Sequence, residues 1–196
     1  MTTADSVPTT HPAFGVGLNV IPFDRSYVVV PGRFLAGVYP ASDDPAETTE
    51  KLLRLQAVGV NHVVNVTEAS EANWQGVALV NYEPELTALA AEQGREVVCR
   101  RFPIRDLDVP SVEIMQAILD DIDGAVAAGR KVYLHCWGGR GRTGTVAGCF
   151  LVRHGLTGDE ALALVRYLRR TDAKAHTESP ETDEQKQFVR RWQAGR

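Results

Sequence analysis

The sequence predicts an α/β fold in which one domain has a central, mainly parallel sheet flanked by helices. Short β-prone runs alternate with longer segments in which apolar residues recur at helical spacing. Strands that alternate with helices build parallel sheets with helices on both faces. The length of 196 residues and the 44% apolar content fit a single core. We therefore expect an extended lead-in over residues 1–25 and one domain over residues 26–196.

The first half of the chain predicts a hairpin, a helix and a buried strand. Two β-prone runs, residues 27–30 and 33–36, are separated by a Pro-Gly turn signal and form an antiparallel hairpin. A helix has Pro45 in its first turn and stops at Gly59. Residues 61–66 then form a buried strand. The apolar residues expected on the inner side of the helix are Leu52, Leu53, Leu55 and Val58.

Helices and strands continue to alternate in the second half. A short helix over residues 84–94 precedes a strand over 96–102. Residues 111–128 carry apolar side chains at helical spacing, and a strand follows directly at 131–134. Three more helices are predicted. The first, residues 143–153, is almost wholly apolar, and the second begins with the capping-box pair Thr157 and Glu160. The third carries Phe188, Val189 and Trp192.

The most informative segment joins the strand over 131–134 to the apolar helix over 143–153. A loop that leaves the carboxyl end of a central strand and enters a helix brings backbone N–H groups and the positive end of the helix dipole to one point. Its glycines, Gly138, Gly139 and Gly141, let the backbone curl with the amides facing inward. The loop is therefore predicted to bind an anion.

Two side chains of this loop indicate chemistry on a phosphate. The amides and the guanidinium of Arg142 favour the thiolate form of Cys136, and the thiolate is the nucleophile of cysteine enzymes. Arg142 is a planar fork that holds two phosphate oxygens during an in-line displacement. The alternatives are a glycine-rich turn with an incidental buried cysteine and, for His135, a satisfied core histidine.

The pattern H-C-x5-R-T over residues 135–143 resembles the active-site loop of the protein-tyrosine-phosphatase superfamily, and the chain is similar to its dual-specificity branch. The resemblance implies a phosphocysteine on Cys136, a Thr143 hydroxyl that hydrogen-bonds the departing thiolate, and a His135 that orients the cysteine. Rhodanese loops have a shorter spacing to arginine, and low-molecular-weight phosphatases and arsenate reductases carry C-x5-R near the N-terminus. The residues expected to bind substrate are Trp137, Gly138, Gly139, Arg140, Gly141 and Arg142, with Trp137 packed under the loop.

A general acid is expected on the loop before the helix over 111–128. The segment Pro103-Ile104-Arg105-Asp106 resembles the P-I-x-D form of the dual-specificity acid loop, which assigns Asp106, with Asp108 as the alternative. Either residue can equally be a solvated loop aspartate. Gln185 matches a glutamine that positions the hydrolytic water in some family members. With Thr182 it equally satisfies a helix capping box.

Charge and cysteine content exclude several classes of function. The net charge is −4 with acidic and basic residues mixed, which is not the pattern of a nucleic-acid-binding protein. The apolar runs are too short for membrane insertion and no signal pattern is present, so we expect a cytoplasmic protein. Three cysteines without CxxC spacing indicate neither disulfides nor structural zinc, and no metal or other cofactor is expected. Cys99 and Cys149 are expected in the core.

The expected function is hydrolysis of phosphomonoesters, with phosphotyrosine proteins, and also phosphoserine or phosphothreonine proteins, as favoured substrates. Arg140 motivates one alternative, a phosphatase for phosphoinositides or inositol phosphates. A catalytically silent phosphate-binding module is the other alternative. Intact Cys136, Arg142 and Asp106 argue against that module, because binding alone needs neither a nucleophile nor an acid. Residues 68–94 form a long region that is expected to shape substrate choice.

Overall fold

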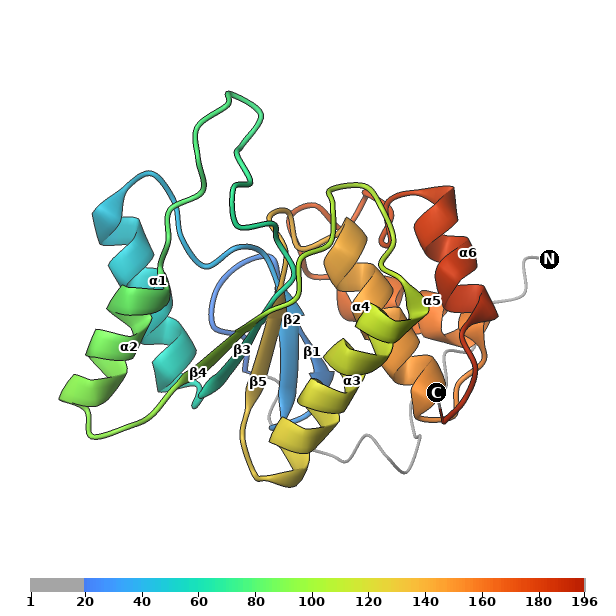
Figure 1. Cartoon of the computed structure of the whole chain (residues 1–196), viewed down its shortest axis with the longest axis horizontal. Coiled ribbons are helices and arrows are strands. Elements are labelled where there is room, and N and C mark those ends of the chain that lie inside the picture. The colour runs from blue at the N-terminus through green and yellow to red at the C-terminus, as the bar shows by residue number, and fades with distance from the viewer. Residues whose placement is uncertain (1–19, 196) are drawn as a thin grey trace.

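Strands and helices alternate along residues 20–195, the part of the chain that the computed structural model describes (Figure 1). Residues 1–19 of the predicted lead-in lie outside this range. The strands are β1 (Ser26–Val30), β2 (Phe34–Gly37), β3 (His62–Asn65), β4 (Val98–Arg101) and β5 (Val132–His135). The helices are α1 (Pro45–Ala57), α2 (Glu83–Glu92), α3 (Val112–Ala127), α4 (Gly141–Arg153), α5 (Gly158–Leu168) and α6 (Asp183–Arg191).

The sheet has the strand order β1-β2-β5-β3-β4. β1 and β2 form the predicted antiparallel hairpin, and the other three pairings are parallel. The mainly parallel sheet predicted from the alternation is therefore confirmed. His135, the last residue of β5, is in register with Gly37 on one neighbouring strand and with Asn65 on the other. Because β2, β3 and β5 run in the same direction, their carboxyl ends meet at one edge of the sheet, where ligands bind in such folds.

Two hydrophobic cores cover the two faces of the sheet. Neighbouring strand residues point to opposite faces, so Val64 enters one core and Val63 the other. The larger core contains residues of α3, α4, α5 and α6, and the smaller one contains residues of α1 and α2. Figure 1 shows the two helix groups on opposite sides of the sheet. α4 lies deepest, with every residue from Gly141 to Val152 buried. The predicted buried helix thus exists and begins two residues earlier than expected.

α1 corrects one expectation about its inner face. Leu52 and Leu55 are fully buried, as predicted, but Leu53 is 42% exposed. Successive helical residues are separated by about 100° around the axis, so Leu53 cannot share a narrow inner stripe with both of these leucines. Thr48 and Gln56 occupy the remaining inner positions. The sequence pattern predicted the helix correctly, but it predicted a buried stripe that is wider than the observed one.

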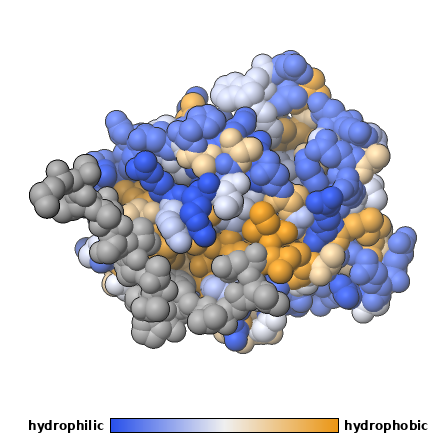
Figure 2. Space-filling view, turned by 180° about the vertical axis from the view of Figure 1, so that it is seen from behind, coloured by the Kyte–Doolittle hydropathy of each residue, from blue (hydrophilic) through white to orange (hydrophobic). Residues whose placement is uncertain are grey.

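The surface carries both polar and apolar regions. Seen from behind, the molecule is mostly hydrophilic, with hydrophobic residues gathered in a band across the middle of that face (Figure 2). Among the described helices, none is both long enough and apolar enough to pass through a bilayer.

Candidate active site

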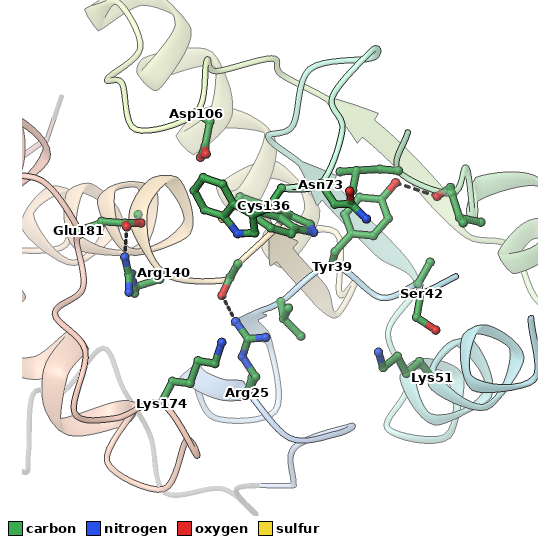
Figure 3. Close-up of a pocket in the computed structure, with 18 of the residues that line it drawn as sticks. Arg25, Tyr39, Ser42, Lys51, Asn73, Asp106, Cys136, Arg140, Lys174 and Glu181 are labelled. Atoms are coloured by element: carbon green, nitrogen blue, oxygen red, sulfur yellow. Dashed lines mark hydrogen bonds and ion pairs between the residues drawn. The ribbon is translucent and has the colours of Figure 1, made fainter. Parts of the chain in front are cut away.

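The loop between β5 and α4 places Cys136 at the floor of a pocket of about 460 Å³ (Figure 3). Cys136 follows the last residue of β5 directly and is 2% exposed. Its backbone N–H donates to Thr143 Oγ1 at 2.8 Å. This bond uses the acceptor capacity of the Thr143 oxygen and does not use its hydroxyl hydrogen. The predicted nucleophile and the predicted thiolate partner are therefore brought together.

Two glycines of the loop stand where a Cβ would approach another element closely. Gly139 has a φ of +67°, and a Cβ there would lie 2.5 Å from the carbonyl carbon of Gly37. A Cβ on Gly141 would lie 3.1 Å from both terminal atoms of the Gln185 amide. The loop therefore packs directly against β2 on one side and α6 on the other. This close packing fixes the curl of the loop around Cys136.

Arg142 is almost completely buried, and its guanidinium is held by three acceptors. Nη1 and Nη2 donate to the two carboxylate oxygens of Glu71 at 2.6 and 2.7 Å, which is a bidentate pair. Nη1 also donates to the Ile104 carbonyl at 3.0 Å. Burial alone would lower the pKa of Arg142, but the hydrogen bonds to Glu71 and the neighbouring negative charges raise it. Nε is buried without a partner among the described residues, so it is a donor available to a phosphate oxygen.

The two candidate acids differ in what they contact. Asp106 lines the pocket, and its Oδ1 lies 2.9 Å from Arg142 Nη2. Its side chain is 42% exposed, so it can turn away from the arginine. Asp108 instead accepts the N–H of Val109 at 2.8 Å with its own side chain, within the loop. The geometry therefore favours Asp106 as the acid.

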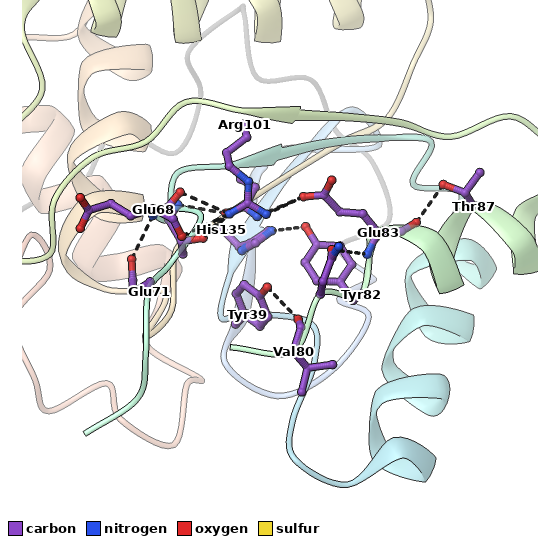
Figure 4. A network of polar contacts seen from close by, with 12 residues as sticks. Tyr39, Glu68, Glu71, Val80, Tyr82, Glu83, Thr87, Arg101 and His135 are labelled. Atoms are coloured by element: carbon purple, nitrogen blue, oxygen red, sulfur yellow. Dashed lines mark hydrogen bonds and ion pairs between the residues drawn. The ribbon is translucent and has the colours of Figure 1, made fainter. Parts of the chain in front are cut away.

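His135 is buried beneath the loop in a network of aromatic and polar side chains (Figure 4). Its Nε2 lies 2.6 Å from the Tyr82 hydroxyl, and its Nδ1 lies 3.2 Å from the Cys136 carbonyl oxygen. Burial lowers the pKa of His135 to about 3 and raises the pKa of Tyr82 far above its usual value. The ring is therefore neutral and the phenol keeps its proton. Because Tyr82 donates to Nε2, Nδ1 carries the hydrogen and donates to the backbone of the cysteine.

A second branch of this network holds the segment that follows β3. Arg101 donates to Glu83 at 2.8 Å and to Thr67 Oγ1 at 3.0 Å (Figure 4). Asn65 in turn accepts the Thr67 N–H at 2.9 Å. These bonds join β3, β4 and the start of α2 next to His135. They fix the base of the segment that carries Glu71.

Gln185 is fully buried at the start of α6 and forms the capping box that the sequence offered as one of its two interpretations. Its Oε1 accepts the backbone N–H of Thr182, and its own N–H donates to Thr182 Oγ1, so the capping box is formed. Its Nε2 also donates to the carbonyl of Asp108 at 3.1 Å. The side chain thus connects α6 to the predicted acid loop, next to Gly141.

Trp137 is only partly buried, although it was expected to pack under the loop. Its side chain packs against the smaller core and also lines the pocket. It meets Trp74 edge to face, with ring centroids 5.3 Å apart. Trp74, which is 80% exposed, belongs to the long segment between β3 and α2.

Positive side chains also reach the pocket from several segments. The predicted substrate contact Arg140 lines it, but its guanidinium forms an ion pair with Glu181. Gly138 lines the pocket as well, and its carbonyl accepts a hydrogen bond from Arg25 Nη2 at 2.7 Å. Lys174 reaches the same pocket from the connection between α5 and α6. Arg140 is thus partly neutralised, whereas Arg25 and Lys174 add charge that the loop pattern did not reveal.

The cysteines outside the loop lie away from the pocket lining. Cys149 is fully buried in α4, and Cys99 is half-buried on β4. All three cysteines are free thiols. Burial raises the pKa of Cys99 to about 12 and that of Cys149 well above its usual value, so both are poor nucleophiles. Among residues 20–195, no three His, Cys, Asp or Glu side chains are grouped so that they could hold a metal ion.

Sequence reasoning missed Glu71, Arg25, Trp74 and Tyr82. Glu68, the first residue of the long region 68–94, is exposed, and Glu71 three positions later reaches Arg142. No local pattern marks Glu71, since it lies in a segment without periodicity. Its one signal is that a buried arginine requires a carboxylate partner. An acidic residue that follows β3, at the same edge of the sheet as the loop, could therefore have been proposed as the partner of Arg142.

Comparisons with known proteins agree with this geometry. A family model described as the Swiss Army Knife protein, DSP-PTPase phosphatase domain, matches residues 24–193. The chain is 40% identical over 87 residues to the uncharacterized protein MJECL20 of Methanocaldococcus jannaschii, covering 44% of this chain and 54% of that protein. It is 29% identical over 94 residues to the Arabidopsis thaliana phosphatidylinositol 3,4,5-trisphosphate 3-phosphatase and protein-tyrosine-phosphatase PTEN1, covering 47% of this chain and 22% of PTEN1.

A solved structure extends the likeness to most of the chain. The crystal structure of Tk-PTP in the active form superimposes with a TM-score of 0.60 at 30% identity, covering 84% of this chain and 93% of Tk-PTP. The matches to the two curated proteins span about half of the first and less than a quarter of the second. The fold is therefore what the chain shares with Tk-PTP, whereas each curated protein resembles less than half of the chain.

Proposed function

Because the chain belongs to the Swiss Army Knife family of DSP-PTPase phosphatase domains, we propose that it hydrolyses phosphomonoesters through a phosphocysteine intermediate on Cys136. One observation carries this proposal. A buried cysteine lines the same pocket as the Asp106 carboxylate, its backbone N–H donates to the Thr143 hydroxyl, and Arg142 Nη2 lies 2.9 Å from Asp106. Binding of phosphate alone would need neither the cysteine nor the acid, which argues against a silent binding module.

In the first half-reaction the Cys136 thiolate attacks phosphorus in line with the ester oxygen. The S–P bond forms as the P–O bond breaks, and Asp106 gives its proton to the leaving oxygen. Arg142 offers Nε and the edge of Nη2 to the phosphate, while Glu71 and the Ile104 carbonyl keep the guanidinium in place. The phosphate takes over the Nη2 contact that Asp106 makes in the free site. Asp106 is then free to turn toward the leaving group.

In the second half-reaction water attacks the phosphocysteine. Asp106, now a carboxylate, accepts a proton from the water as the O–P bond forms and the S–P bond breaks. The thiolate that leaves is stabilised by the Thr143 hydroxyl, by the amides of the loop and by the start of α4. Gln185 acts here through its bond to the Asp108 carbonyl, which holds the acid loop against the catalytic loop.

Phosphotyrosine in proteins, with phosphoserine and phosphothreonine as further groups, stays the first substrate prediction. The edge-to-face pair of Trp74 and Trp137 supports it, because this wall of the pocket can contact the flat ring of an aryl phosphate. The name of the relative PTEN1 includes protein-tyrosine-phosphatase activity. We also propose a cytoplasmic site of action, where a reducing environment keeps the Cys136 thiol free.

Phosphoinositides and inositol phosphates are the second candidate. The sequence argument for them rested on Arg140, which is weakened by its ion pair with Glu181. Arg25 and Lys174 on the pocket wall now support this candidate instead. PTEN1 is also named as a phosphatidylinositol 3,4,5-trisphosphate 3-phosphatase.

The decisive experiment assays 4-nitrophenyl phosphate hydrolysis by the purified chain in the presence of a metal chelator, with vanadate as competitor. We expect turnover, competitive inhibition by vanadate, and no turnover by Cys136→Ser, which should still bind inorganic phosphate. Cys149→Ser is the matched control, since it also replaces a buried thiol but lies outside the pocket lining. Full activity of Cys136→Ser, or binding of phosphate without turnover by the parent protein, would reject the proposed function.

A further inference from the structure

Two basic side chains from distant parts of the chain meet the pocket beside the catalytic loop. Arg25 precedes β1, and Lys174 lies in the connection between α5 and α6. Both side chains line the pocket that contains Cys136, and Figure 3 shows both reaching toward it from the same side. The aromatic wall of Trp74 and Trp137 belongs to other segments. The pocket is therefore larger and more basic than one phosphate requires.

These two cations differ from the other basic residues of the pocket in lacking a carboxylate partner. The other three are each paired, Arg140 with Glu181, Lys51 with Glu47 and Arg169 with Asp172. Within residues 20–195, neither Arg25 nor Lys174 forms an ion pair through its side chain. Like charges that share a pocket wall repel each other, and a bound anion would remove that repulsion.

Arg25 is held in place at a conformational cost. Its φ of +62° lies in the left-handed region, which residues with a side chain adopt only when surrounding structure enforces it. The guanidinium is anchored by the bond from Nη2 to the Gly138 carbonyl, and Nε is buried without a partner in the described part of the chain. Strain of this kind is concentrated at functional sites. An unpartnered buried donor next to the catalytic loop is a second sign of a missing acceptor.

The geometry points to a second anion subsite, formed by Arg25 and Lys174, that binds a second phosphate of the substrate while the first lies over Cys136. This inference rests on the proposed phosphatase function and names the substrate class of the same site. The substrate is a polyol that carries two or more phosphates on one small ring, as in the inositol phosphates. The inference therefore concerns the second of the two substrate candidates.

The contact of Arg25 with the catalytic loop supports this class of substrate. Arg25 contacts Gly138, which is only two residues from Cys136, and two residues span at most about 7 Å. Neighbouring phosphates on one ring fit such a separation. Two phosphorylated residues of a peptide project from separate backbone positions at the ends of long side chains, so they fit it poorly. Soluble inositol phosphates and phosphoinositide headgroups share the required chemistry.

The test compares the specificity constants for an inositol bisphosphate and for 4-nitrophenyl phosphate in the parent protein and in Lys174→Gln. Lys174 is exposed, so the substitution should not disturb folding. We expect the ratio of the two constants to fall about tenfold, the effect of losing one charged hydrogen bond. Arg191→Gln is the matched control, because it removes one positive charge from an exposed site on α6 and should leave the ratio unchanged. Arg25→Gln, checked for folding by circular dichroism, should lower the ratio as well.

A parallel arm replaces the soluble bisphosphate with a short-chain phosphoinositide bisphosphate. A fall in the ratio with either the soluble bisphosphate or the phosphoinositide supports the subsite. The compound that shows the larger fall identifies the substrate. An unchanged ratio in both variants would overturn the subsite, as would a preference for doubly phosphorylated peptides over both inositol substrates. If the parent protein does not hydrolyse 4-nitrophenyl phosphate at all, the proposed function fails. If the parent protein hydrolyses 4-nitrophenyl phosphate but the ratio of specificity constants is the same in the parent and both variants, only the subsite is rejected.

Discussion

Glu71 holds Arg142 through two parallel hydrogen bonds of 2.6 and 2.7 Å, and both side chains are almost fully buried. A carboxylate placed in this way fixes the plane of the guanidinium and leaves Nε and one edge of Nη2 for the phosphate. It also compensates for the burial of a charge far from water. In the proposed mechanism Glu71 is therefore a positioning residue, since it would act on the phosphate through Arg142.

We predict that Glu71→Gln lowers kcat/KM for aryl phosphates about 100-fold, the scale of a catalytic group displaced by about 1 Å. The same change should lower the free energy of unfolding by on the order of 3 kcal/mol, because it leaves a buried charge without its partner. Urea denaturation and steady-state kinetics measure the two effects. Glu68→Gln is the matched control, with an exposed side chain and an expected stability change within about 0.5 kcal/mol. Equal behaviour of the two variants would contradict the role of Glu71.

Asp106→Asn should slow the release of poor leaving groups much more than that of good ones. Removing a general acid costs about 100-fold or more when the leaving oxygen needs a proton, and much less when it is already a stable anion. The measurement is the dependence of kcat/KM on leaving-group pKa for a series of aryl phosphates, which should steepen in Asp106→Asn. Asp108→Asn should keep the parent slope, because the Asp108 side chain bonds to its own loop. A steep slope in Asp108→Asn alone would exchange the two assignments.

The Gln185→Glu variant tests the contact with the acid loop independently of the cap of α6. Glutamate at this position still completes a capping box with Thr182, but it places an acceptor against the Asp108 carbonyl where the amide donates. We expect slower hydrolysis of the intermediate, seen as a larger steady-state fraction of phosphoenzyme. Thr182→Ala removes the cap at a cost of about 1 kcal/mol and should leave that fraction as in the parent. Accumulation in Thr182→Ala would assign the effect to the helix cap instead.

The lowered pKa of His135 predicts that the free energy of unfolding depends on pH. Its pKa falls from 6.5 to about 3 on folding because burial disfavours the charged ring. Between these values the unfolded chain binds one more proton than the folded one, so stability decreases as the pH falls from about 6.5 toward about 3. We expect His135→Asn to reduce this slope by up to about 1.4 kcal/mol per pH unit, as measured by urea denaturation at pH 7, 6 and 5. An identical pH profile in parent and variant would show that His135 titrates normally in the fold.

The sequence predicted the order of the elements and the loop between β5 and α4 because both depend on local patterns. Hydrophobic periodicity and glycine stops marked the strands and helices, and the spacing from Cys136 to Arg142 marked the loop. The neighbourhood of that loop depended on tertiary contacts. Trp137 was predicted to pack under the loop, yet its ring also lines the pocket and meets Trp74, which lies far from it in the sequence.

The residues that complete the site were hidden for the same reason. Glu71 lies in a segment without periodicity, and its role follows only from the parallel pairing that brings the ends of β3 and β5 to one edge. Arg25 and Lys174 are separated by most of the chain and meet because β1 and the connection after α5 border the same pocket. Ionic partners of this kind have no fixed spacing in a sequence. Such partners can be identified only when the fold is known.

The central claim is that phosphorus becomes bonded to the sulfur of Cys136 during turnover. The most direct measurement is acid quenching of Asp106→Asn during hydrolysis of an activated aryl phosphate, followed by peptide mapping with mass spectrometry. This variant should accumulate the intermediate, because the good leaving group departs without an acid while the attacking water lacks its base. We predict a phosphoryl group on the peptide that contains Cys136. Continued turnover with that cysteine unmodified at every quench time would contradict the account.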